Sequence, residues 1–285
     1  MPTWLPWPES TCDGVRATQE GALLRLTLAT PDTRNAQTPA LWRRLAEVGQ
    51  NLPPEIRVIL IDADGPSFSA GLDRRMFTPT GVPGEHTFLD LASASPEVAD
   101  GWISEFQSAF TWQGNCAAVT IAAVHGHAIG AGFQLALACD LIVAANDVQF
   151  AMREVPLGLI PDLGGSQRLA QLVGPQRALL ACATGSTINA EMAAQWGLAI
   201  PCLPGLDLEG TAMTIIDQLL SVPQSSLRAI KVLMHQALGR SRADQLSLER
   251  TLQLDLLRER VQAFTAGSTD RSPSGSTPTG PTGAP

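Results

Sequence analysis

TIAAVHGHAIGAGFQLALACD, residues 120–140, joins an apolar β-branched run to a glycine-rich bend and then to a helical pattern. The apolar run predicts a strand at Val119–Val124 that is buried on both faces of a sheet. Gly130 and Gly132 have no side chains, so a ligand can approach the backbone closely, and residues 133–139 have the spacing of a buried helix. Such a bend aims free N–H groups and the positive end of a helix dipole at one point. That point favours an oxyanion or a polarised carbonyl oxygen, and a tight turn packed with small residues is the alternative.

The composition bounds the class of protein. The 285 residues are 45% hydrophobic, which is enough for one large domain or for one domain with an appendage. We expect no membrane span, because no apolar run approaches the roughly 20 residues that cross a bilayer, and no signal peptide, because the first residues lack a basic and then apolar pattern. The five scattered cysteines indicate reduced core residues of a cytoplasmic protein and show no metal-ligand spacing. The net charge of −8 argues against a nucleic-acid partner.

The remaining pattern is that of an α/β protein. We expect a hairpin over residues 15–28, a helix from 39 to about 52, a strand at 57–62, an irregular segment at 76–96 and a helix at 96–112. After the central stretch, we expect strands at 140–145 and 199–203, with helices at 163–173, 175–184 and within 185–196. From residue 208 onward the pattern is almost entirely helical. Residues 267–285 are too polar to bury apolar surface and predict a disordered tail.

Three ordered motifs make this chain resemble the enoyl-CoA hydratase/isomerase (crotonase) superfamily. The resemblance covers residues 15 to 264. It rests on IAAV (121–124), Gly126, GAG (130–132) and ACD (138–140), on FSAGLD (68–73), and on REVPLGLIPD (153–162).

The resemblance implies a crotonase-like α/β fold, a spiral of β-β-α units followed by a C-terminal helical trimerisation region. We therefore expect an N-terminal extension at 1–14, a core domain at 15–204, a helical region at 205–266 and the tail at 267–285. It also implies a homotrimer, or a hexamer of paired trimers, that binds an acyl-CoA thioester. No separate cofactor is expected, because coenzyme A enters as part of the substrate.

The same resemblance assigns residues to the site. The backbone N–H groups of Ala70 and Ala131 would form an oxyanion hole for the thioester enolate. Phe264 matches an aromatic residue near the adenine, and helix packing is its alternative. The acyl pocket would be lined from the irregular segment and the helix after it, with Phe77, Phe88, Leu89, Trp102, Phe106 and Phe110 as candidates. The other expected contacts to substrate or coenzyme are Arg34, Ala36, Ser69, Gly71, Leu72, Asp73 and Gly130.

The candidate catalytic residues are Glu154, Asp162 and Gln134. Hydratases of this family use two glutamates, and Gln134 stands in place of the first, which puts the two-carboxylate route to hydration in doubt. Dienoyl-CoA isomerases of the family carry a Glu and an Asp at the positions of Glu154 and Asp162. We therefore favour double-bond isomerisation with Glu154 moving the proton and Asp162 assisting.

Other interpretations stay open at this point. The chain could be an enoyl-CoA hydratase with Glu154 as its sole acid/base, or a non-catalytic acyl-CoA binding protein that has lost the chemistry with Gln134. Asp162 could be a helix N-cap in Pro-Asp-Leu-Gly-Gly, and Glu154 could be a surface loop carboxylate.

Overall fold

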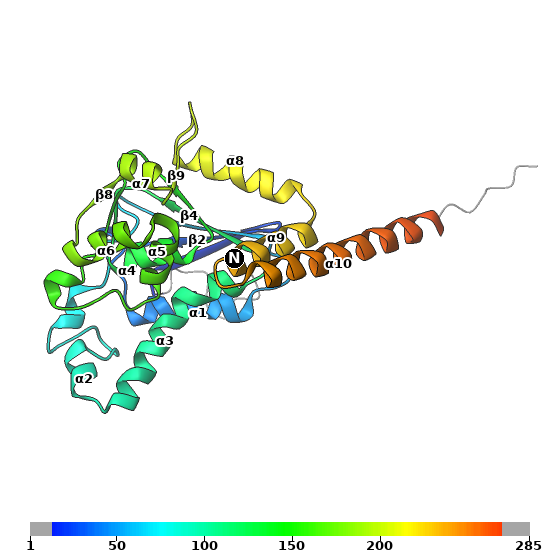
Figure 1. Cartoon of the computed structure of the whole chain (residues 1–285). Helices are drawn as coiled ribbons and strands as arrows, with labels where there is room; N and C mark the ends of the chain where they lie inside the picture. The colour runs from blue at the N-terminus through cyan, green and yellow to red at the C-terminus, as the bar shows by residue number, and fades with distance from the viewer. Residues whose placement is uncertain (1–12, 270–285) are drawn as a thin grey trace, which may run out of the picture. The chain divides into compact units, whose positions relative to one another are not determined.

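The computed structural model describes residues 13–269, and the chain forms two compact units that divide between Lys231 and Val232. The first unit is built on a six-stranded sheet with the order β1-β2-β3-β4-β6-β9 (Figure 1). β1 and β2 form the predicted antiparallel hairpin, and the other neighbours are parallel. The strands are β1 (Val15–Glu20), β2 (Leu23–Leu28), β3 (Val58–Ala63), β4 (Val119–Val124), β6 (Leu141–Ala144) and β9 (Ile200–Pro201).

Both faces of this sheet are covered, as the apolar run of β4 predicts. Ala122 and Val124 face a large apolar cluster, whereas Ile121 and Ala123 face a smaller one on the other side of the sheet. Side chains alternate between the faces of a strand, so a run without polar residues fits only a sheet buried on both sides. α1 (Pro39–Asn51), α3 (Pro96–Asn115), α4 (Ala131–Ala138) and α5 (Gly165–Val173) contribute to the large cluster, and α8 (Leu208–Ser221) to the small one.

A three-stranded sheet of order β5-β7-β8 continues from the central one. It comprises β5 (His127–Ile129), β7 (Gln149–Ala151) and β8 (Ile188–Asn189). The chain passes from β4 to β5 through Gly126, whose φ is +54° and where a Cβ would lie 2.2 Å from the carbonyl oxygen of Pro66. Only glycine fits this close approach of two chain segments. β5 then delivers the bend at Gly130 to the start of α4.

Some elements differ from the sequence prediction. The segment predicted to be irregular, residues 76–96, overlaps the 3₁₀ turn η2 (Arg74–Phe77) and contains the helix α2 (Phe88–Ser93). α2 forms because Thr87 and Asp90 make a reciprocal capping box at its N-terminus. The last strand is shorter than predicted, since Pro201 has no N–H with which to continue the ladder. The helix α6 (Pro175–Thr184) has the predicted bounds, and α7 (Ala190–Trp196) follows it.

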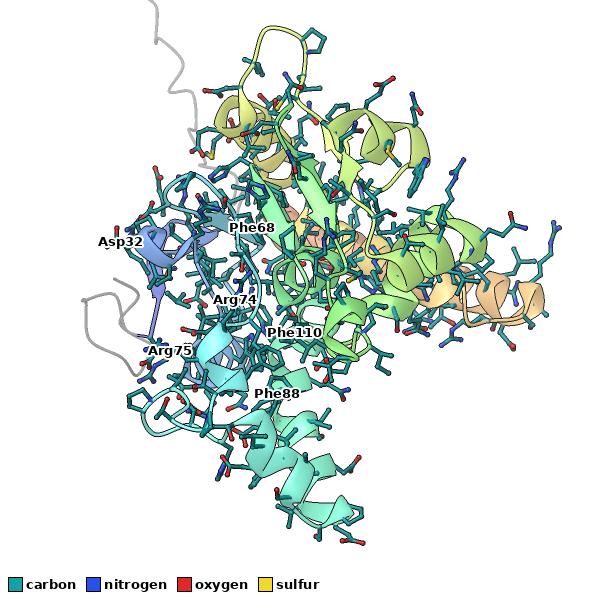
Figure 2. The ribbon with its side chains drawn as sticks, turned by 90° about the vertical axis from the view of Figure 1, so that its left-hand side faces the viewer. Asp32, Phe68, Arg74, Arg75, Phe88 and Phe110 are labelled. Carbon is teal, nitrogen blue, oxygen red and sulfur yellow. The ribbon has the colours of Figure 1, made fainter. Side chains whose placement is uncertain are left out.

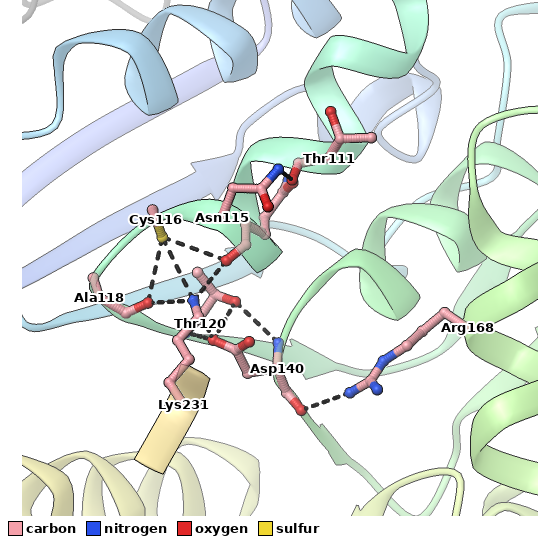
Figure 3. Close-up of polar contacts among 9 residues, drawn as sticks. Thr111, Asn115, Cys116, Ala118, Thr120, Asp140, Arg168 and Lys231 are labelled. Atoms are coloured by element: carbon pink, nitrogen blue, oxygen red, sulfur yellow. Dashed lines mark hydrogen bonds and ion pairs between the residues drawn. The ribbon is translucent and has the colours of Figure 1, made fainter. Parts of the chain in front are cut away.

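A buried ion pair involves Lys231, the last residue of the first unit. The Nζ atom of Lys231 lies 2.8 Å from Oδ2 of Asp140 and donates to the carbonyl oxygens of Gln113 and Ala118, each at 2.6 Å (Figure 3). Asp140 also accepts from the backbone N–H of Thr120, at the start of β4. Lys231 is only 7% exposed, so full satisfaction of its charge is what makes its burial tolerable.

The helical pattern after residue 208 is confirmed as α8, α9 (Gln224–Ala237) and α10 (Arg242–Thr269). The predicted boundary lay at residues 204–205, but α8 packs on β3, β4 and β6, so the first unit extends to Lys231. The second unit consists of the end of α9 and of α10, which exposes Leu254, Leu257, Val261 and Phe264. α10 enters the first residues of the predicted tail, and residues 270–285 lie outside the described part, as do residues 1–12.

Within residues 13–269, no helix combines the length and the apolar character that crossing a bilayer requires.

Candidate active site

A cavity of about 720 Å³ lies in the first unit, next to the glycine-rich bend. Its wall is assembled from five regions of the chain: α1, the loop after β3 with η2 and α2, α3, the bend with α4, and the segment between β7 and α5. Parallel strands place their carboxyl ends at one edge of a sheet, which is why these loops meet there. The lining includes Trp42, Ala70, Gly71, Leu72, Arg74, Phe77, Phe88, Phe106, Gly130, Ala131, Gln134, Arg153, Glu154, Asp162 and Leu163.

The bend brings backbone and a carboxylate close together. Gly130 adopts φ +51° and ψ −116°, so the chain turns sharply between β5 and α4, and Ala131 becomes the first residue of the helix. A Cβ on Gly130 would lie 3.4 Å from Oε1 of Glu154. Gly132 packs directly on Ser69, to whose Cβ an added Cβ would lie 2.7 Å. The small residues of the bend therefore serve both packing and close approach, which the sequence prediction had left as alternatives.

The loop opposite the bend is fixed by a buried polar network. The Ser69 hydroxyl donates to the carbonyl oxygen of Asn35 at 2.7 Å and accepts from the N–H of Gly71 at 3.2 Å. The Gln37 amide donates to that hydroxyl at 3.3 Å and accepts from Nε1 of Trp42 at 2.8 Å. Asn35, Gln37 and Ser69 are all 0% exposed. Ser69 thus holds the loop in place and does not line the cavity, so its predicted contact with substrate or coenzyme stays a prediction.

The structure also corrects one of the two predicted oxyanion donors. The N–H of Ala70 already donates to the carbonyl oxygen of Arg34 at 2.8 Å. Gly71 follows with φ +90°. Leu72 lies opposite Gln37, but the two hydrogen bonds between these segments are made by the carbonyl oxygen of Gly71 and the N–H of Asp73, not by the N–H of Leu72. Among the described residues, no acceptor takes the N–H of Leu72 or that of Ala131, and both residues line the cavity. Leu72 and Ala131 are therefore the pair of donors that the geometry leaves available.

Glu154 and Gln134 form a hydrogen-bonded pair at the cavity wall. The Nε2 of Gln134 donates to Oε1 of Glu154 at 2.9 Å, and the Gln134 oxygen accepts from the backbone N–H groups of Leu163 at 2.9 Å and Gly165 at 3.3 Å. Gln134 is 1% exposed. The other oxygen of Glu154, Oε2, is buried and has no hydrogen-bond partner in residues 13–269. Burial raises the pKa of Glu154, and the nearby charge of Asp162 adds to the rise.

Asp162 lies on the same wall and is not a helix cap. α5 begins at Gly165, and its N-cap is Gly164, so the N-cap interpretation of Asp162 is wrong. Its carbonyl oxygen accepts from Nε2 of Gln107 on α3 at 2.7 Å, which fixes the loop that carries it. Burial raises the pKa of Asp162. The cavity therefore holds two carboxyl groups that both retain protons more readily than ordinary ones.

The other predicted contacts fall into two groups. Gly71, Leu72 and Gly130 line the cavity. Asp73 instead forms an ion pair with Arg75 at 2.7 Å, which lowers the pKa of Asp73 through the hydrogen bonds from Arg75. Arg34 is exposed and Ala36 is half-buried, and neither lines the cavity. Phe264 is 79% exposed and belongs to the second unit, so its contact with adenine stays a prediction.

Trp42, Arg74 and Arg153 are among the cavity-lining residues that the sequence analysis did not assign to the site. The two arginines line the cavity, and neither forms an ion pair within the described chain. Figure 2 marks Arg74 and Phe88 on the part of the molecule that carries η2 and α2. Of the six predicted pocket residues, Phe77, Phe88 and Phe106 line the cavity, whereas Leu89, Trp102 and Phe110 do not. Two features of the sequence could have identified these arginines: Arg74 directly follows the FSAGLD motif, and Arg153 directly precedes Glu154.

Comparisons with known proteins agree with this geometry. The family model described as enoyl-CoA hydratase/isomerase matches residues 18–267. A probable enoyl-CoA hydratase of Mycobacterium tuberculosis is 32% identical, over 80% of this chain and 83% of its own length. Carnitinyl-CoA dehydratase of Escherichia coli is 31% identical, over 77% of this chain and 79% of its own.

Solved structures extend the likeness to three dimensions. A Thermobifida fusca protein crystallised in complex with CoA has a TM-score of 0.83 and 41% identity, covering 89% of this chain and 96% of its own. A crystal structure in complex with acetoacetyl-CoA, also from Thermobifida fusca, has a TM-score of 0.82 and 42% identity, covering 88% and 97%.

Proposed function

Because this chain belongs to the enoyl-CoA hydratase/isomerase family, we propose that it shifts a double bond along the acyl chain of an enoyl- or dienoyl-coenzyme A thioester. Membership of the family confirms the predicted crotonase superfamily and its α/β fold. It also makes the chain an acyl-CoA-processing enzyme. The choice of isomerisation within that family rests on the residues around Glu154.

The observation that carries the proposal is the state of the Glu154 carboxylate. One oxygen is held by Gln134, and the other, Oε2, is buried at the cavity wall without a partner. An unpaired buried carboxylate oxygen costs free energy, which a proton taken from substrate would relieve. Since burial raises the pKa of Glu154, it accepts a proton more readily than an ordinary glutamate and can return it.

The reaction then needs one proton and no water. Glu154 removes a proton from one end of a three-carbon unit of the acyl chain, and the electron pair moves toward the thioester carbonyl. The oxygen of the resulting dienolate accepts from the N–H groups of Leu72 and Ala131. The proton returns to the other end of the unit, and the double bond has moved with no change in mass. Asp162, whose pKa burial also raises, assists as the second carboxyl group.

Gln134 supports this choice over hydration. Its oxygen is occupied by two backbone N–H groups and its nitrogen by Glu154, so it offers no free acceptor to a water molecule. Its amide also fixes which oxygen of Glu154 faces the cavity. Gln134 therefore acts as a positioning residue for Glu154 in this proposal.

The coenzyme part of the substrate requires cations, because the chain as a whole carries a charge of −8. Arg74 and Arg153 line the cavity without carboxylate partners in the described residues, and a guanidinium group pairs well with phosphate. We assign the phosphates to these two residues, with Arg34 retained as an additional candidate from the loop before α1. The predicted homotrimer or hexamer, with trimerisation through the C-terminal helices, is retained as a proposal.

Hydration is the second candidate, because several relatives are described as enoyl-CoA hydratases and others as carnitinyl-CoA dehydratases. In that reaction Glu154 would be the sole acid/base.

The test is incubation with 2-enoyl-, 3-enoyl- and dienoyl-CoA esters in heavy-oxygen water, followed by mass spectrometry. A product of unchanged mass with a shifted double bond is expected. A labelled 3-hydroxyacyl product would favour hydration, and binding without any product would leave a non-catalytic acyl-CoA binding protein. Glu154→Gln should slow the shift by about 10²–10⁴-fold while binding persists.

A further inference from the structure

Four aromatic side chains form one part of the cavity wall: Trp42, Phe77, Phe88 and Phe106, here called the aromatic wall. They come from α1, η2, α2 and α3. From this wall we propose that the acyl group of the substrate carries an aromatic ring. The inference rests on the proposed function, since it names the acyl group that the same site would take.

The aromatic wall offers an apolar surface whose single polar side-chain atom is already hydrogen-bonded within the chain. Phe77 and Phe88 stack with their centroids 4.5 Å apart and their planes at 9°. Trp42 and Phe106 lie 5.1 Å apart at 57°. The only polar atom among these side chains, Nε1 of Trp42, already donates to Gln37. An added ring gains offset or edge-to-face contacts here that an alkyl chain does not make.

The aromatic wall is also held in place before any substrate arrives. Arg43 on α1 pairs with Glu85 and with Glu105 on α3, which ties the segment before α2 to two helices. His86 stacks on Trp102 of α3 with centroids 3.9 Å apart. Trp42 packs edge-on against Phe110, a further ring from α3. A preorganised apolar site selects a rigid, flat group, because a flexible alkyl chain loses more conformational entropy on binding.

The charged and polar side chains of the lining suit the other parts of the substrate. Glu154, Asp162 and Gln134 belong to the reacting end, and Arg74 and Arg153 suit the coenzyme phosphates. Arg74 shares η2 with Phe77, so a carboxylate on the acyl group is the main rival occupant and enters the test.

The test compares saturated thioesters, which bind without reacting. The quenching of intrinsic tryptophan fluorescence reports binding, because Trp42, one of the six tryptophans of the chain, lines the cavity. We expect 4-phenylbutanoyl-CoA to bind about tenfold more tightly than decanoyl-CoA, which has the same number of carbon atoms, and more tightly than glutaryl-CoA. Calorimetry gives the same affinities without relying on fluorescence.

Variants tie that preference to the aromatic wall. Phe88→Leu and Phe77→Leu keep an apolar side chain and remove the ring, so each should lower the ratio of aryl to alkyl affinity severalfold. Leu89→Ala, on the exposed side of α2, should leave the ratio unchanged. Decanoyl-CoA or glutaryl-CoA binding as tightly as the aryl ester would overturn the proposal, as would an unchanged ratio in both phenylalanine variants.

Turnover separates this inference from the proposed function. In 4-phenylbut-3-enoyl-CoA a proton moves from C2 to C4 as the double bond moves from C3–C4 to C2–C3, and the reverse reaction starts from the 2-enoyl ester. Preferential binding of the saturated aryl ester without such a shift in any ester would refute isomerisation and leave the acyl group assigned. A shift of the double bond in alkyl esters, without preferential binding of aryl esters, would support isomerisation and refute the aromatic acyl group.

Discussion

Replacing Gln134 by glutamate would put two carboxylates side by side in the cavity wall. The Nε2 atom of Gln134 lies 2.9 Å from Oε1 of Glu154, so in Gln134→Glu an oxygen takes the place of that donor. The other oxygen keeps its two backbone partners at the start of α5, since a carboxylate accepts from N–H groups as well as an amide does. The substitution therefore changes one contact from attraction to repulsion without changing the shape of the side chain.

The size of the effect follows from that distance. Two unit charges 2.9 Å apart repel by about 6 kcal/mol at an effective dielectric constant of 20. The two N–H groups at the start of α5 offset about half of this, because hydrogen bonds to a charged acceptor are stronger. We expect a loss of about 3 kcal/mol in the free energy of unfolding at pH 8, which leaves a chain of ordinary stability folded.

The loss should depend on pH in a defined direction. In the folded variant the repulsion raises the pKa of the pair above that of the two carboxyl groups in the unfolded chain, so the pair takes up a proton as the pH falls. The destabilisation is then largest at pH 8, shrinks as the pH falls, and vanishes where both groups are protonated in both states. Denaturant unfolding at pH 8 and pH 5 measures it.

The chain contains a matched control for this substitution. Gln195 donates to Glu191 at 3.1 Å on the exposed surface of α7, so Gln195→Glu creates the same contact in water. For Gln195→Glu we expect a loss of less than about 1 kcal/mol in the free energy of unfolding at either pH, because solvent screens the charges. Equal losses in the two variants, or a loss in Gln134→Glu that does not change with pH, would refute the reasoning. Gln134→Glu should also incorporate heavy oxygen from water into product if the missing second carboxylate is what impairs hydration.

Three further substitutions test other parts of the structure. Glu154→Gln should lower turnover by about 10²–10⁴-fold and, since burial raises the pKa of Glu154, should unfold at higher temperature than the unmodified chain at pH 8 but not near pH 4. Lys231→Met should cost about 3–5 kcal/mol in denaturant unfolding because Asp140 loses its counter-charge, and a loss below 1 kcal/mol would show that the pair is dispensable. Gly132→Ala should cost about 1–3 kcal/mol through its clash behind the bend, whereas Gly101→Ala, with open space around it on α3, should be neutral or slightly stabilising in the same assay.

The fold and the position of the site could largely be predicted from local patterns. The apolar run of β4 required a doubly covered sheet, and the prolines and glycines at helix ends gave α1 and α6 nearly to the residue. These signals are local because the strand period, the capping residues and the missing N–H of proline act within a few positions of the chain. The motifs also brought Glu154, Asp162 and Gln134 together, and the structure places all three on one cavity.

Tertiary structure alone decided which groups at the site are free to act. The N–H of Ala70 is taken by Arg34 and that of Leu72 is not, a difference set by how two distant loops cross. Gln134 could be identified from the sequence as an unusual neighbour for a catalytic glutamate. Its amide hydrogen-bonds both to Glu154 and to backbone N–H groups of Leu163 and Gly165. These contacts join segments that are distant in the chain. Hydrogen-bond partners of this kind have no sequence period, so the sequence determined the fold and the chemistry of the residues, and only packing determined their roles.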